Sequence, residues 1–314
     1  DLRTWPVLTL RSCGGVRAMA APSRTNIRNS YPLYFLAPAL LIFTVFFIGP
    51  AIVGMQLSFT DATVRSLNPK WVGLDNYVQL FTATGGNIWN AIGNTLIYAV
   101  LVSIVKTSLG IAIALFLHMK FKGRNALRAL IYMPIMFSAV VIGILFNYIL
   151  KPDGPLNAVL GWLGLGFLQQ NWLGSFDIAL YSVVGVDSWV YVGWTVVIVL
   201  AALGGVPKEC LESADIDGAG AFRKFFLIRL PLISDSVTVA FLLTIISGMK
   251  VFDLIYTTTG GGPGYSTQVI STFIAKSLGS GLLGFASAAS VLQFVFISIV
   301  SLAIQGVISW KSRD

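Results

Sequence analysis

Six long apolar runs dominate the sequence and limit what the chain can fold into. They cover Tyr34–Phe59, Ile92–Leu117, Leu127–Leu150, Ile178–Leu203, Leu232–Phe252 and Leu283–Ile308. Each run is long enough for a helix that crosses a bilayer, which needs roughly 18 or more apolar residues. Transmembrane β-strands would alternate apolar and polar positions instead. We therefore predict an all-α, polytopic membrane protein with six transmembrane helices.

The charge content supports a membrane location. Of the 314 residues, 56% are hydrophobic and 11% are charged, whereas soluble domains carry roughly 25% charged residues. A very apolar soluble protein would lack the charge to cover its water-facing surface. The net charge of +8 does not indicate nucleic-acid binding, because the basic residues lie between the apolar runs and form no basic stripe.

The distribution of Lys and Arg predicts the orientation of the helices. Basic residues gather in the N-terminal tail, between runs two and three, between runs four and five, and at the C-terminus. The alternate loops hold only Arg65, Lys70, Lys151 and Lys276. Because cytoplasmic loops carry the excess of basic residues, we expect both termini in the cytoplasm.

The first 30 residues differ from the rest of the chain. We expect 1–30 to form a flexible, basic cytoplasmic tail and 31–314 to form the membrane domain. A secretory signal peptide is the alternative, because Ala18–Ala20 resembles a cleavage site. The apolar stretch Trp5–Leu10 is short for the core of such a signal. We expect the start residue of the protein to be either Asp1 or Met19.

A charged segment, 207–231, separates runs four and five. Its acidic residues are Glu209, Glu212, Asp215 and Asp217, and the two glutamates are the only ones in the chain. Pro207 suits the first turn of a helix, so we expect a short amphipathic helix over Lys208–Asp217. Gly218 permits a sharp turn. Four aromatic or branched residues then form an apolar stripe before Pro231, which favours a surface that docks onto another protein over a solvated loop.

This segment resembles the EAA motif of ABC importer permeases. In that motif three residues of any kind separate a Glu and two small residues from a Gly, and nine residues of any kind separate that Gly from Ile-x-Leu-Pro. The matching residues are Glu212, Ser213, Ala214, Gly218, Ile228, Leu230 and Pro231. Ser213 replaces an alanine and keeps the position small. The string Ile216–Ala219 resembles the carbohydrate-uptake branch, which includes maltose and glycerol-3-phosphate permeases.

Four other stretches resemble the same branch, so the resemblance covers 31–314. They are Val72–Tyr77, Asn94–Thr95, Thr259–Gly264 and Ala286–Ala288. The resemblance implies a bacterial or archaeal plasma-membrane importer with a second permease subunit, two ATPase subunits and an extracytoplasmic substrate-binding protein. It also implies that the ATPase is coupled through Glu209, Glu212, Ser213, Ala214, Asp217, Gly218 and Ala219.

No residue pattern in the chain indicates catalysis or a cofactor. There is no GxxxxGK[ST] sequence, so the chain cannot bind ATP in the P-loop manner. ATP and magnesium are expected on a partner ATPase. Cys13, Cys210 and the single histidine, His118, lie in no metal-binding or disulfide pattern.

Ionisable residues inside apolar runs are candidates for the substrate path. Asp187, Tyr191 and Trp194 follow i, i+4, i+7 spacing and share a helix face in run four. An aromatic ring and a carboxylate suit a sugar, and Asn147 in run three could add to the site. The alternative is a packing face in which Asp187 forms a buried ion pair with Lys106.

Two more charges lie one helical turn apart near the outer end of run five. Lys250 and Asp253 either pair with each other at the membrane interface or form an extracellular gate. The runs otherwise hold few basic residues that could bind a phosphate, which favours neutral sugars as substrates.

Other functions remain open at this point. The permease could serve amino acids, phosphate or polyamines, although the IDGA and TGGGP strings disfavour this. A proton-coupled transporter could use Asp187, Asp253 or Lys106 as relays, but would not need the charged segment. An intramembrane aspartyl protease would need GxGD, whereas Gly185-Val186 precedes Asp187.

Overall fold

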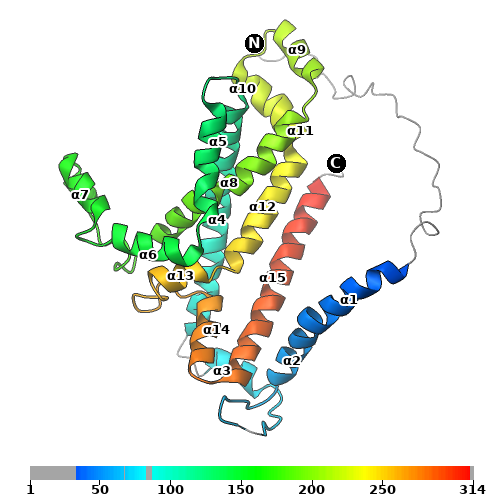
Figure 1. Ribbon diagram of the computed structural model, residues 1–314, viewed down its shortest axis with the longest axis vertical. Coiled ribbons are helices and arrows are strands. Elements are labelled where there is room, and N and C mark those ends of the chain that lie inside the picture. Colours follow the sequence, from blue (N-terminus) through cyan, green and yellow to red (C-terminus); the bar gives the residue numbers. More distant parts are fainter. Residues whose placement is uncertain (1–32, 67, 83–86, 312–314) are drawn as a thin grey trace. The chain divides into compact units, whose positions relative to one another are not determined.

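The computed structural model describes residues 33–66, 68–82 and 87–311, and these ranges contain helices but no β-strand (Figure 1). The expected basic tail at 1–30 lies outside the described residues. The chain divides into two compact units. One unit comprises 1–52 and 207–228, and the other comprises 53–206 and 229–314.

Three helices form the centre of the larger unit. They are α4 (Asn87–His118), α8 (Ala179–Gly204) and α12 (Ser234–Met249), and they run side by side (Figure 1). Small residues let them approach closely, as is common between membrane helices. A Cβ on Gly110 of α4 would lie 2.5 Å from Cγ2 of Thr195 in α8, and one on Gly248 of α12 would lie 2.8 Å from Cα of Ala99.

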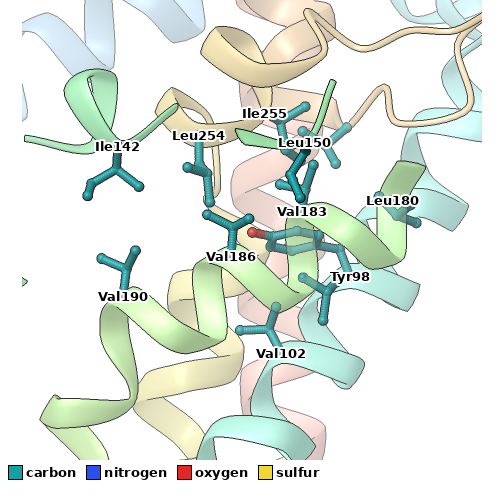
Figure 2. Packing of buried hydrophobic residues seen from close by; sticks show 12 residues of the cluster. Tyr98, Val102, Ile142, Leu150, Leu180, Val183, Val186, Val190, Leu254 and Ile255 are labelled. Atoms are coloured by element: carbon teal, nitrogen blue, oxygen red, sulfur yellow. The ribbon is translucent and has the colours of Figure 1, made fainter. Parts of the chain in front are cut away.

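The main apolar cluster of this unit joins α4 and α8 to two shorter helices, α6 (Ala139–Ile149) and α13 (Asp253–Thr258). Figure 2 shows Tyr98 of α4 directed between the side chains of α8. Val183 and Val190 of α8 are fully buried, as is Ile255 of α13. Residues distant in sequence thus hold the ends of several apolar runs together.

Three of the four stretches that resemble the carbohydrate-uptake branch lie in helices that pack together at one end of the larger unit. α3 (Asp75–Thr82) and α14 (Ile270–Gly279) pack there against the first turns of α4 and α15 (Leu283–Lys311). Ala288 and Ala289 are fully buried beside Ile270. Their small side chains explain why the start of the last run is rich in alanine and serine.

Hydrogen bonds anchor two of these stretches to other segments of the larger unit. Nδ2 of Asn94 donates to the carbonyl oxygens of Tyr265 and Gln268 at 3.2 and 3.0 Å, and the backbone N–H of Ile270 donates to Oγ1 of Thr95 at 3.1 Å. Asn94–Thr95 therefore fixes the chain that follows the glycine-rich loop to α4. Nδ2 of Asn76 similarly donates to the carbonyl oxygens of two residues after α2 (Gly49–Leu57), at 2.8 Å each.

Two of the six predicted spans are not single helices. Four helices are long and apolar enough to cross a membrane: Tyr34–Leu57, Asn87–His118, Ala179–Gly204 and Leu283–Gly306. The predicted third span breaks between Met136 and Ala139, and its two halves differ in direction by 97°. The predicted fifth span corresponds to α12, which ends at Met249, before the predicted Phe252. Across a break at Ile233, α12 follows the helical stretch Ala221–Leu232, most of which belongs to the charged segment. The number of spans is six only if each broken pair counts as one.

The break in the third span has a local cause. α5 (Arg124–Tyr132) gives way to a short 3₁₀ turn that contains Pro134, which lacks a backbone N–H. Phe137 and Ser138 are then extended, with ψ of 147° and 136°. Apolar content alone does not register such a break, because the residues on both sides remain hydrophobic.

Asn157 organises the chain between α6 and α8. It lies in α7 (Pro155–Trp162) and is buried. Its Nδ2 donates to the carbonyl oxygens of Pro152 and Gln170, and its Oδ1 accepts from Nε1 of Trp172 at 2.8 Å. One side chain therefore closes a loop of irregular backbone.

We expect Asn157→Ala to loosen this loop. Each buried polar group left without a partner costs about 1–3 kcal/mol, so amide exchange in residues 152–172 should accelerate by at least about tenfold. Hydrogen–deuterium exchange of the purified protein tests this. Gln169→Ala removes one hydrogen bond, from Nε2 of Gln169 to the Asn157 carbonyl, and should have a smaller effect. Equal exchange in both variants would show that Asn157 is not the centre of the loop.

Candidate functional site

The helix predicted in the charged segment is present as α9 (Lys208–Ile216) in the smaller unit. It ends in a turn stabilised by two backbone hydrogen bonds. The N–H of Gly218 donates to the carbonyl of Asp215 at 3.1 Å, and the N–H of Ala219 donates to that of Ala214 at 2.9 Å. This is the Schellman arrangement, which needs a residue with positive φ after the helix. Gly218 supplies it with φ of 70°.

An ion pair closes the other side of this turn. The ammonium of Lys224, in α10 (Ala221–Lys224), bonds to the carboxylate of Asp215 in α9. The pair is partly exposed, so its contribution to stability is only about 0.2–1 kcal/mol. Together with the two backbone bonds, it defines how α10 leaves α9.

The predicted coupling residues differ in exposure. Glu209, Glu212, Ser213, Asp217 and Gly218 are exposed, Ala219 is half-buried and Ala214 is buried. Two large apolar side chains flank the turn: Ile216 is 88% exposed and Phe222 is 83% exposed. In the sequence, Ile216 stood out only as part of the string Ile216–Ala219, and neither residue was singled out as a contact residue. Such exposure next to several carboxylates indicates a protein-binding surface more than a lipid-facing one.

The larger unit contains the buried ion pair that the sequence left as an alternative. Nζ of Lys106 in α4 lies 2.5 Å from Oδ2 of Asp187 in α8, and their side chains are only 3% and 8% exposed. The ammonium also lies 5.0 Å from the ring centroid of Tyr191, one helical turn along α8. Lys106 therefore has both a carboxylate and an aromatic partner within this chain.

The side chains predicted to share one face of α8 extend from the interior to the surface. Asp187 is buried, Tyr191 is half-buried and Trp194 is 60% exposed. Asp253, the first residue of α13, is exposed. Asn147 instead donates a hydrogen bond from Nδ2 to the carbonyl of Thr258 at 2.6 Å, which links α6 to α13.

Lys250 faces a different region from Asp253. It lines a groove of about 650 Å³ between the end of α12, α14 and α15. The two ion pairs among the described residues are Lys106–Asp187 and Lys224–Asp215, so Lys250 and Asp253 do not form the ion pair that was one of the alternatives. The reason is that α12 ends at Met249 and a new helix begins at Asp253, so the two residues do not share one helical turn.

The other polar residues of this groove were missed from the sequence. They include Ser271 of α14 and Ser290, Gln293 and Ser301 of α15. Nε2 of Gln293 donates to Oγ of Ser271 at 2.8 Å and to the carbonyl of Met249 at 3.1 Å. A signal was present, because Ser290, Gln293 and Ser301 recur at helical spacing within an apolar run and mark one polar stripe.

Comparisons with known proteins agree with the EAA resemblance. A family model described as the binding-protein-dependent transport system inner membrane component matches residues 106–313. The multiple sugar-binding transport system permease protein MsmF of Streptococcus mutans is 32% identical over 268 residues, which cover 85% of this chain and 91% of that protein. The trehalose/maltose transport system permease protein MalF of Thermococcus litoralis is 34% identical over 267 residues, which cover 83% and 88%.

The fold is also similar to that of solved transporters. One chain of a bacterial ABC transporter involved in the import of the acidic polysaccharide alginate has a TM-score of 0.76 and 26% identity, and the match covers 87% of this chain and 93% of that one. The chain therefore belongs to the family of binding-protein-dependent transport system inner membrane components, as a multi-pass permease of an ABC importer for sugars or oligosaccharides.

Proposed function

We propose that segment 207–231 binds a separate ATPase and transmits its conformational changes to the membrane helices. That ATPase would bind ATP and magnesium. The observation that carries this proposal is the pair of exposed apolar side chains, Ile216 and Phe222, on either side of a conformationally defined turn. Binding energy at protein interfaces concentrates in a few large apolar anchors surrounded by polar residues. The exposed Glu209, Glu212 and Asp217 would provide that polar surround.

The proposed topology has six spans with both termini in the cytoplasm. The alternation of basic loops supports it. This topology places 207–231 in the cytoplasm and the end formed by α3 and α14 outside the cell. The substrate-binding protein would then meet the latter end, and two ATPase subunits would meet the permeases from the cytoplasm.

We expect truncation of the two apolar anchors to weaken ATPase binding. Ile216→Ala or Phe222→Ala should each cost about 2 kcal/mol, which is the size typical of interface anchors and corresponds to about 30-fold in the dissociation constant. Titration of purified permease with the ATPase subunit measures this. Met136→Ala is the matched control, because Met136 is an equally exposed apolar residue, at 87%, outside the segment.

Two results of that titration would argue against the docking role. One is an unchanged dissociation constant in both anchor variants. The other is an equal loss in Met136→Ala, which would show that any exposed apolar side chain supports the complex. Uptake of labelled sugar by proteoliposomes should fall in parallel with ATPase binding in the anchor variants only.

The proposed substrate path follows the polar positions of the larger unit and is completed by a second permease, as in a heterodimer. Lys250 contributes through its groove, and Tyr191, Asp253 and Trp194 contribute through exposed or half-buried surfaces. Trp194 has an exposed ring that could stack on the apolar face of a sugar. Asn147 is better explained as a link between α6 and α13.

Alternating access would then follow from movement of helix bundles around this path, as in other transporters. A proton relay through Asp187 is less well supported, because its carboxylate is already paired with Lys106. The sugar class of the substrate rests on the relatives, which include permeases for multiple sugars and for trehalose and maltose.

A further inference from the structure

We infer that the groove beside Lys250 selects a sugar that carries a negative charge, such as a uronic-acid oligosaccharide. The groove holds about 650 Å³, which is within the range of roughly 300–1,000 Å³ typical of small-molecule sites. This inference rests on the proposed substrate path and specifies the chemistry of what moves along it.

The charge of the groove is the first observation. Ten residues line it, and Lys250 is the only ionisable one among them. Neither ion pair of the described residues includes Lys250. An ammonium next to apolar helices is costly unless an anion or water compensates it. A ligand carboxylate bound there would gain a charge-assisted hydrogen bond, which is stronger than one between neutral groups.

The remaining lining residues suit the hydroxyls and the ring of a sugar. Nε2 of Gln293 already donates to Met249 and Ser271, and no hydrogen bond among the described residues uses its carbonyl oxygen. That oxygen can accept from a sugar hydroxyl. Oγ of Ser301 is buried and has no hydrogen-bond partner in the described part of the chain. Phe294 is 69% exposed and offers a face for stacking.

A negatively charged substrate would differ from the neutral sugar that the sequence favoured. That expectation counted basic residues within the predicted spans and treated Lys250 as a residue of the membrane interface. In the structure the same lysine lines a mostly apolar groove that also contains Gln293 and four serines. A neutral sugar would satisfy Gln293 and the serines but would leave the ammonium without a counter-charge.

The test compares two trisaccharides of similar size, trigalacturonate and maltotriose. Each is titrated against the whole transporter in nanodiscs, without the binding protein, and saturation-transfer NMR detects weak binding. We expect trigalacturonate to bind the unmodified transporter more tightly than maltotriose. Lys250→Met should lower the affinity for trigalacturonate by about tenfold, as expected for loss of one hydrogen bond to a charged group. It should leave the affinity for maltotriose unchanged. Lys250→Arg should retain binding.

Lys151→Met is the control, because Lys151 is an exposed lysine outside the groove, and it should change neither affinity. If Lys250→Met lowers the affinity for both sugars equally, the groove lies on the path but does not select charge, so only this inference is wrong. If it lowers the affinity for neither sugar, both the path through the groove and the inference are wrong. Equal or absent binding of the two sugars to the unmodified transporter also overturns the inference.

A carboxylate from the second permease is the competing partner for Lys250. In that case Lys250→Met would release the second permease during gel filtration, whereas the Lys151→Met complex would stay intact. That outcome would overturn the inference, because the charge of Lys250 would then be neutralised within the assembly. Co-elution of both permeases in the Lys250→Met variant, together with selective loss of trigalacturonate, supports it.

Discussion

Gly218→Val should reduce ATP-driven sugar uptake by at least about tenfold, while the protein still inserts into the membrane. The residue has φ of 70° at the end of α9, and an L-residue in this left-handed region pays about 1–2 kcal/mol, with β-branched residues among the least tolerated. Valine would force the turn out of the Schellman geometry. It would therefore displace Phe222 relative to Ile216 and disrupt the surface proposed to hold the ATPase.

The chain offers a matched control two residues away. Gly220 has φ of −65°, which any residue can adopt, and neither glycine has an atom within 4 Å of where a Cβ would lie. Gly220→Val therefore adds the same volume without the strain and should retain uptake. Gly218→Asn should keep more activity than Gly218→Val, because Asn tolerates the left-handed region. Equal losses at Gly218 and Gly220 would show that added volume, and not the turn, is what matters.

Sugar uptake and the amount of permease in the membrane fraction, measured together, separate this effect from a folding defect. With the turn displaced, proteoliposomes should lose sugar uptake, while the amount of permease recovered from the membrane stays the same. Loss of the Gly218→Val protein from the membrane fraction would instead indicate a folding defect and would count against a specific coupling role.

The sequence predicted the class of fold and the charged segment well, because both depend on local patterns. Continuous apolar runs indicate helices wherever the backbone stays regular, and the spacing of Pro207 and Gly218 predicted α9 and its turn closely. The broken third span was missed because both sides of the break at Phe137 and Ser138 stay apolar. A hydropathy profile records apolar content along the chain and does not detect a change of helix direction.

The candidate substrate residues were harder to predict, because their roles depend on contacts between distant helices. Spacing along α8 grouped Asp187 with Trp194, but one is buried and the other is exposed. Lys250 and Asp253 looked like neighbours on one helix until the break between α12 and α13 separated them. The polar stripe that includes Gln293 was readable from spacing, but it contains no charge and so did not stand out from an apolar run.

Single substitutions in the buried pair should be the most destabilising changes in the larger unit. Lys106→Met leaves the Asp187 carboxylate buried without its partner, and Asp187→Leu does the same to the Lys106 ammonium. Removing one member of a buried ion pair typically costs about 3–5 kcal/mol, whereas replacing both by apolar residues is often neutral. The double variant should therefore regain most of the thermal stability that either single variant loses.

The double variant also decides between the two roles of Asp187. If the pair only packs α4 against α8, restoring stability should restore sugar uptake as well. If Asp187 contacts the substrate, the double variant should unfold at nearly the normal temperature but remain inactive. Asp253→Asn is the control, because it removes an exposed carboxylate and should leave stability unchanged. Since Lys106 already holds Asp187 at 2.5 Å and also faces the ring of Tyr191, we expect stability and uptake to recover together.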